Sequence, residues 1–213
     1  MLKFYSWKDI DMQFVCEASS LDEYLCEDEI VNYSHPLIRK TIQQLQETSN
    51  VAVECVKQTF EFVRDTIPHS WDAQNPQVTC SASEVLQHQT GICYAKSHLL
   101  AALLRGQGIP TGFCYQRLTL GDTPETGYVI HAFNAVYLPS LRQWIRLDAR
   151  GNKPGIQAEF SLEQEKLAFS IRPELDEVDY PTIYSHPHAK IVATLQQHTD
   201  SLQMCQFSLP ERL

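Results

Sequence analysis

Three residue types in this sequence can together carry out thiol chemistry. Cys93 lies in the first turn of a predicted helix, residues 90–105. A thiol nucleophile needs a base within hydrogen-bond reach, and the base needs a group that orients it. His131 and Asp148 lie on two predicted strands further along the chain. The combination predicts nucleophilic catalysis by Cys93, with His131 as the base and Asp148 as its partner.

The spacing of the two strands predicts how the base and the carboxylate meet. If the hairpin turns symmetrically about Pro139-Ser140, then Leu138 faces Leu141 and His131 faces Asp148. Directly opposed residues have Cβ atoms about 5 Å apart, so Asp148 accepts a hydrogen bond from Nδ1 and leaves Nε2 for the thiol. A proline disfavours a two-residue turn, and a loop of odd length would move the carboxylate to the opposite face.

The helix around Cys93 has clear sequence signals. Thr90 is the expected N-cap, Gly106 and Gly108 supply stop signals, and Pro110 prevents continuation. The segment beyond the first turn is apolar almost all the way round, which predicts a buried helix. The positive end of the helix dipole stabilises a thiolate in the first turn.

Helical patterns precede this helix and strand patterns follow it. Ser81 with Glu84 forms an expected capping box. The predicted helices are one beginning at Pro36, one from Asn50 to Ile67 and one from Ala82 to about Gln87, with a further one from about His188 to Gln197. The predicted strands cover 112–120, 127–138 and 142–149, with additional short strands at 12–15 and 167–171, and an acidic helical turn lies between Leu21 and Ile30.

Composition excludes several classes of partner. The net charge of −9 argues against nucleic acid as a partner. The sequence contains no run of about 18 apolar residues, so no membrane span is expected. The N-terminus has no apolar signal region, so a cytoplasmic location is expected. The seven cysteines are irregularly spaced and include no metal-ligand pattern, so we expect no disulfide framework, no metal site and no cofactor.

Three segments resemble the transglutaminase-like superfamily, in that family's order of Cys, His and Asp. They are Gly91-Ile92-Cys93-Tyr94-Ala95 with the helix that follows and Gly108-Ile109-Pro110, then His131-Ala132-Phe133-Asn134-Ala135-Val136, then Trp144-Ile145-Arg146-Leu147-Asp148-Ala149. The resemblance covers about residues 50–150. It implies a papain-like α+β fold, with N-terminal helices and a buried Cys helix packed on an antiparallel β-sheet. We expect one domain over 1–213, its core at about 50–150, with an N-terminal extension (1–35) and a C-terminal elaboration (156–213).

The resemblance also implies site residues. It assigns a catalytic triad to Cys93, His131 and Asp148. In this family an upstream side chain completes the oxyanion hole, and our candidates are Trp71 first, then Gln87 or Gln89. The chain resembles compact prokaryotic members, and nothing in it resembles the calcium sites or barrel domains of animal transglutaminases.

The expected function is acyl transfer by a thiol enzyme, acting on peptide, protein or small amide substrates. Water as acceptor would make it a cysteine protease or amidase, and an amine would make it a transglutaminase; hydrolysis is the simpler expectation. A non-catalytic peptide- or protein-binding module is the alternative. A hydrolase that uses Cys93, His131 and Asp148 as metal ligands is a third reading. The sequence leaves the substrate and the oligomeric state open.

Overall fold

The structure, a computed structural model, describes residues 14–47, 49, 51–121 and 123–213. Helices dominate the first half of the chain, and all the strands except the two-residue β1 come after residue 110. In chain order the elements are β1 Val15–Cys16, η2 Leu21–Leu25, α1 Pro36–Gln46, α2 Ala52–Thr66, α3 Ala82–His88, α4 Cys93–Arg105, β2 Thr111–Thr119, η3 Pro124–Thr126, β3 Tyr128–Leu138, β4 Gln143–Leu147, η4 Pro173–Leu175, β5 Val178–Asp179, β6 Thr182–Ile183, α5 Ala189–Gln197 and α6 Ser201–Phe207.

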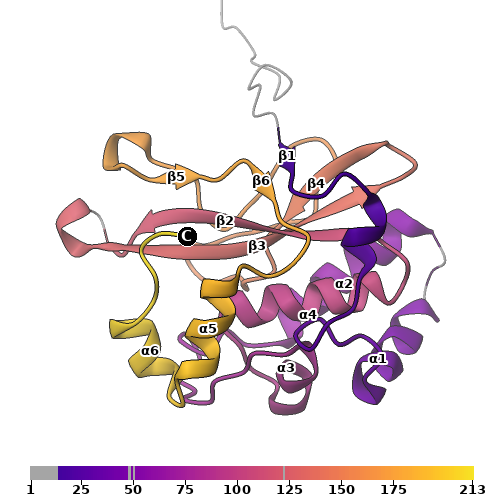
Figure 1. Cartoon of the computed structure of the whole chain (residues 1–213), viewed down its shortest axis with the longest axis horizontal. Coiled ribbons are helices and arrows are strands. Elements are labelled where there is room, and N and C mark those ends of the chain that lie inside the picture. Colours follow the sequence, from indigo (N-terminus) through magenta and orange to yellow (C-terminus); the bar gives the residue numbers. More distant parts are fainter. Residues whose placement is uncertain (1–13, 48, 50, 122) are drawn as a thin grey trace, which may run out of the picture.

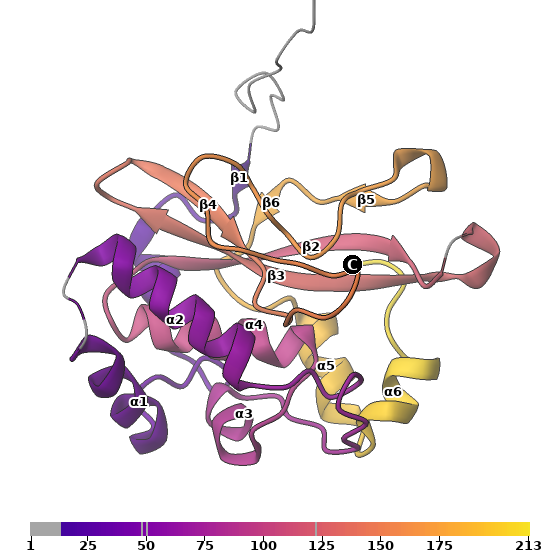
Figure 2. The same cartoon turned by 180° about the vertical axis from the view of Figure 1, so that it is seen from behind.

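An antiparallel sheet and a layer of helices form the two main layers. The four strands of the sheet lie in the order β4-β3-β2-β5. The helices cover one face, whereas β1 and β6 pair with each other on the opposite side (Figures 1 and 2). The largest apolar cluster fills the space between the helices and the sheet. A smaller one lies on the other face around Tyr24 and Phe133. This is the expected α+β architecture, with helices packed on an antiparallel sheet.

Helix α4 is the central element of the helical layer. Every residue from Tyr94 to Arg105 is buried, and the helix contacts α2, α3 and β3. Its leucines and alanines have high helix propensity, and burying each leucine side chain contributes about 1.5–3 kcal/mol. The prediction of a buried helix ending before Gly106 is therefore confirmed.

The predicted N-cap of α4 is wrong. The cap position is Ile92, which makes no side-chain cap bond, and Cys93 is the first helical residue. Thr90 cannot serve because it lies before the helix begins. Its hydroxyl instead bonds that of Ser70, and its carbonyl accepts a bond from the Thr79 hydroxyl.

Most of the other predicted elements are present, with shifted ends. The Ser81–Glu84 capping box is formed, and α1 begins at Pro36 as expected. The predicted acidic turn is a short 3-10 helix, η2. Of the strand predicted at 12–15, positions 12 and 13 lie outside the described residues, and Val15 belongs to β1. The strand predicted at 167–171 is wrong because this segment is irregular chain. Strands β5 and β6 and helix α6 are not predicted by the sequence pattern.

The register of the β3–β4 hairpin also differs from the prediction. Leu138 pairs with Gln143, so four residues form the loop and its centre is one position later than expected. Arg142 adopts a left-handed φ of 52° at the end of this loop. Continuing the register places position 148 opposite Phe133, two residues from His131. An even offset keeps His131 and Asp148 on the same face, although they are not direct cross-strand neighbours.

Candidate active site

Cys93 and His131 are brought together by α4 and β3. Cys93 is half-buried at the first position of α4, and the His131 side chain is only 5% exposed. The Cys93 thiol lies close enough to the His131 ring to raise the pKa of that imidazole. Packing of α4 across β3 therefore produces a Cys–His contact between residues that are far apart in the sequence.

Asp148 binds the other side of the same imidazole. Its Oδ2 lies 2.7 Å from His131 Nε2. The sequence-based assignment of ring nitrogens is thus reversed, because Nε2 serves the carboxylate and Nδ1 remains for the thiol. The two-residue offset in register explains the reversal, since Asp148 approaches the ring from beyond the end of β4 rather than from directly across the hairpin.

Two backbone amides fix the carboxylate of Asp148. The N–H of Arg150 donates to Oδ1 at 3.2 Å, and the N–H of Ala168 donates to Oδ2 at 3.1 Å. Ala168 belongs to the irregular segment after residue 156. A completely buried carboxylate needs such donors to remain charged, so the C-terminal part of the chain takes part in building the site.

The electrostatics of the pair favour an imidazolium and a carboxylate. Burial by itself would lower the pKa of His131, but the Asp148 carboxylate and the Cys93 thiol outweigh it and raise this pKa to about 10. Burial opposes ionisation of Asp148 in the same way, yet His131 and the two backbone donors leave the pKa of Asp148 below its usual value. Both partners are therefore stabilised in their charged forms.

Aromatic side chains hold the imidazole in place. The Phe169 ring meets the His131 ring edge to face at 5.0 Å between centroids, and the Phe133 ring stacks nearly parallel to it at 5.9 Å. These contacts restrict rotation of the imidazole and exclude water from its hydrogen bonds.

His69 is a site residue that the sequence reasoning missed. Its Nε2 accepts a hydrogen bond of 3.2 Å from the backbone N–H of Cys93, and its Nδ1 is buried without a hydrogen-bond partner among the described residues. Burial, with Arg150 adding to it, lowers the pKa of His69, so the ring is neutral. The sequence feature that could have identified His69 is its position. It directly follows Pro68 and lies two residues before Trp71, in the loop that contains the predicted oxyanion candidate.

The three predicted oxyanion candidates lie differently. Trp71 is 39% exposed. The Gln87 and Gln89 side chains are exposed at the end of α3, and the Gln89 amide donates to the carbonyl of Leu86. Across the described part of the chain, none of the three has a hydrogen bond to Cys93. Their proposed role remains a prediction, whereas His69 is the upstream residue in contact with the nucleophile.

Charged groups tie the loop after Pro68 to the loop after Asp148. The Arg150 guanidinium donates two hydrogen bonds to Asp72, at 2.7 and 3.2 Å, and Lys153 contacts the same carboxylate. This ion-pair cluster holds the pKa of Asp72 down to about 2 despite the opposing effect of burial. It fixes the loop that carries His69 against the loop that carries Asp148.

Lys96, one turn after the nucleophile, is completely buried. Its ammonium group contacts the carbonyls of Arg64 and Ile67 at the end of α2. Burial, and after it the nearby Arg150 charge, lowers the pKa of Lys96 to about 7. The side chain therefore caps α2 from within the core and anchors the first turns of α4 to it.

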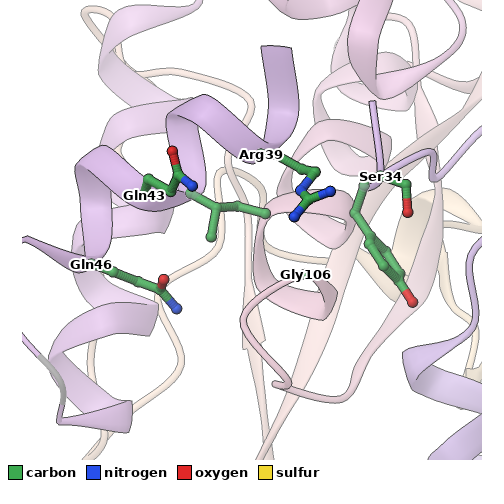
Figure 3. A pocket seen from close by; sticks show the side chains of 7 residues that line it. Ser34, Arg39, Gln43, Gln46 and Gly106 are labelled. Atoms are coloured by element: carbon green, nitrogen blue, oxygen red, sulfur yellow. The ribbon is translucent and has the colours of Figure 1, made fainter. Parts of the chain in front are cut away.

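A surface cavity of about 340 Å³ lies at the opposite end of α4 (Figure 3). It is lined by Tyr33, Ser34, Arg39, Ile42, Gln43, Gln46 and Gly106. Because α4 spans 13 residues at 1.5 Å each, this cavity is separated from Cys93 by almost 20 Å of helix. It does not contribute to the Cys–His–Asp site.

The described residues contain no group of three or more His, Cys, Asp or Glu side chains arranged to hold a metal ion. Among these same residues, no helix combines the length and apolar character that crossing a bilayer requires.

Comparison with known proteins places this geometry in a family. The family model described as "Transglutaminase-like superfamily" matches residues 39–149, just over half of the chain. That range contains α4, β3 and β4 together with Cys93, His131 and Asp148. No curated protein matches the chain.

Solved structures give more distant matches. One, from Cytophaga hutchinsonii and described as a "Putative Cysteine Protease", is 17% identical with a TM-score of 0.49; the match covers 62% of this chain and 43% of that one. The periplasmic domain of TgpA from Pseudomonas aeruginosa is 18% identical with a TM-score of 0.45, over 59% of this chain and 45% of that one. The match thus spans less than half the length of either structure.

Proposed function

Because the chain belongs to the transglutaminase-like superfamily, we propose that it is a thiol-dependent acyl-transfer enzyme acting on amide or peptide-type bonds. Cys93 is the nucleophile, His131 the general acid and base, and Asp148 the residue that orients His131. One observation carries the proposal: the His131 ring is hydrogen-bonded to the Asp148 carboxylate, 2.7 Å from Nε2, and lies close enough to the Cys93 thiol for both groups to raise its pKa.

The reaction follows from these contacts. His131 accepts the proton of the Cys93 thiol, and the sulfur attacks the acyl carbonyl carbon to form a tetrahedral oxyanion. His131 then gives its proton to the leaving nitrogen as the C–N bond breaks, which yields an acyl-enzyme thioester and a free amine. A water molecule or a second amine, deprotonated by His131, attacks the thioester and restores the thiol. Asp148 keeps the ring oriented and its charge balanced throughout.

We propose that the oxyanion binds beside the Cys93 amide and His69 Nε2 and replaces the 3.2 Å hydrogen bond between them. In the free protein the amide donates to Nε2 of neutral His69, which places the ring proton on Nδ1, a buried atom without a partner. Leaving a buried donor unpaired is unfavourable. If a carbonyl oxygen enters and the proton moves to Nε2, the oxygen accepts from both groups and no buried donor is left unpaired. Binding of the acyl group is thereby favoured, and each such donor is worth about 3–4 kcal/mol in the transition state.

The acceptor of the acyl group divides the proposal into two branches. Release to water makes the protein a protease or amidase, and transfer to an amine makes it a transglutaminase. The sequence-based expectation of hydrolysis is the branch we retain, and product analysis with and without an added primary amine distinguishes the two.

A screen of acyl substrates tests the proposal. Wild-type protein should release product from peptide esters or amides and accumulate a thioester at Cys93, and Cys93→Ala should do neither. If wild-type and Cys93→Ala give the same background rate on every acyl class, while peptides bind to both, the protein is a binding module and the enzymatic proposal fails.

A further inference from the structure

The C-terminal residues run beside the strand that carries His131. Strand β4 pairs only with residues 134–138 of β3, so the first half of β3 has an edge that β4 does not cover. The N–H of Ile130 on this edge donates to the carbonyl of Pro210 at 2.8 Å. Figures 1 and 2 both show the chain leaving α6, rising to the sheet and ending beside it.

This contact lies immediately next to the candidate triad. Ile130 precedes His131, and its carbonyl accepts a hydrogen bond of 2.8 Å from the hydroxyl of Tyr94, which follows Cys93. Helix α6 is attached to the loop that carries His69, because the N–H of Ser201 donates to the carbonyl of Pro76 at the end of that loop. A chain bound at Ile130 therefore lies beside the residue that precedes His131, and Ile130 is itself bonded to the residue that follows Cys93.

The final six residues, 208–213, make few attachments. Beyond the Pro210 bond, the Lys190 ammonium donates to the carbonyl of Arg212 at 2.8 Å. Leu209 and Leu213 are partly buried against the main apolar cluster. They are four residues apart, an even spacing that puts both on one face of an extended chain.

We propose that the β3 edge at Ile130 is the binding site for the backbone of the acyl donor, and that residues 208–213 occupy it in the free protein. An edge N–H that pairs with an extended segment is how strand addition recognises peptides. The proposal rests on the proposed function and names its substrate class: an extended peptide with apolar side chains an even number of residues apart. Such a peptide replaces residues 208–213 when it binds.

Two electrophiles separate this proposal from the reactivity of Cys93 itself. Iodoacetamide is small and needs no strand pairing, whereas an extended apolar peptide with a C-terminal chloromethyl ketone needs the β3 edge. The variants are the chain ending at Phe207 and full-length Lys190→Met, which loses the contact to Arg212. If residues 208–213 fill the edge about nine-tenths of the time, their removal speeds labelling of Cys93 by the peptide about tenfold. The rate with iodoacetamide should stay within about twofold of wild type.

The outcomes are distinguishable. Equal peptide labelling in wild type and in both variants, with fast iodoacetamide labelling, overturns the strand-pairing proposal and leaves the proposed function intact. Slow iodoacetamide labelling of Cys93 in every form contradicts the proposed function instead.

A measurement on the full-length wild type covers the case in which the shortened chain does not fold. Attaching the peptide to Cys93 should displace residues 208–213 and speed the removal of residues 211–213 by carboxypeptidase, while the Ile130 amide stays protected from hydrogen exchange. The control is alkylation with iodoacetamide, which should leave the rate of carboxypeptidase cleavage unchanged. An unchanged cleavage rate after peptide attachment overturns the proposal.

Discussion

His131 Nε2 lies 2.7 Å from Asp148 Oδ2, although the two residues are not paired across the hairpin. Asp148 comes after the last residue of β4 and is fixed by the amides of Arg150 and Ala168. The carboxylate is thus positioned by the chain that follows the strand as well as by the strand itself. Because the carboxylate occupies Nε2, Nδ1 is the ring nitrogen that remains for the Cys93 thiol.

Replacing Asp148 with Asn should change the protonation of His131. The pKa of His131 is raised to about 10 in the folded protein, so its ring carries a proton throughout the neutral range. The stabilisation this provides is fully present below the unfolded value of about 6.5 and is lost as the pH rises through about 10. In Asp148→Asn the imidazole should titrate at a lower pH, and acylation should fall by about a hundredfold or more. NMR titration of the ring checks this, and an unchanged midpoint would contradict it.

His69→Phe should slow acylation while leaving the triad intact. The variant keeps a ring in place but removes the nitrogen that contacts the Cys93 amide. Loss of one group at the oxyanion position lowers the acylation rate by about a hundredfold, whereas alkylation by iodoacetamide should change little. Trp71→Phe, Gln87→Ala and Gln89→Ala are matched controls for the sequence-based candidates. If one of these control variants greatly slows acylation and His69→Phe does not, the oxyanion role belongs to the residue replaced in that control.

Lys96→Met should reveal a pH-dependent contribution to stability. The Lys96 ammonium is buried and its pKa is lowered from 10.5 to about 7, so the unfolded chain binds more protons than the folded one between these values. Stability conferred by Lys96 therefore rises with pH in this interval. From pH 7 to 9, the free energy of unfolding of wild type should gain about 2 kcal/mol relative to Lys96→Met. Denaturant unfolding at several pH values measures this, with exposed Lys40→Met as the control. A constant difference would show that Lys96 stays charged when folded.

Gly112→Ala should weaken the attachment of β6 to the sheet. A Cβ at this position would lie 2.4 Å from Ile183 Cγ2 and 2.9 Å from the carbonyl oxygen of Tyr184. The backbone oxygen has little room to move, so we expect a loss of about 1–3 kcal/mol in the free energy of unfolding. Chemical denaturation checks the value, and an unchanged midpoint would mean that this contact is looser than the structure indicates.

Periodicity and breaker residues were sufficient to predict the main elements. The apolar pattern after Cys93 and the glycines that follow it define α4, and alternation after Pro110 defines β2, β3 and β4. These are long segments in which many residues report the same structure. They also bring Cys93 close to His131, because a helix and a sheet of this kind must pack on each other.

The parts that failed depend on local geometry or on distant contacts. The hairpin register depends on a loop whose last residue, Arg142, has a positive φ that its sequence does not require. The role of His69 depends on a bond to a backbone amide, which leaves no pattern in the side chains. Strands β5 and β6 have two residues each, too few for any alternation to be detected.

The rate at which iodoacetamide labels each cysteine tests the central claim most directly. Labelling at pH 6–7, followed site by site with mass spectrometry, compares Cys93 with the exposed residues Cys16 and Cys26 in the same molecule. Because the thiolate is the reactive form, the Cys93–His131 pair predicts that Cys93 reacts at least about tenfold faster than either, and that His131→Ala abolishes the difference. If Cys93 reacts no faster than Cys16 and Cys26, the thiol is not activated and the proposed function is contradicted.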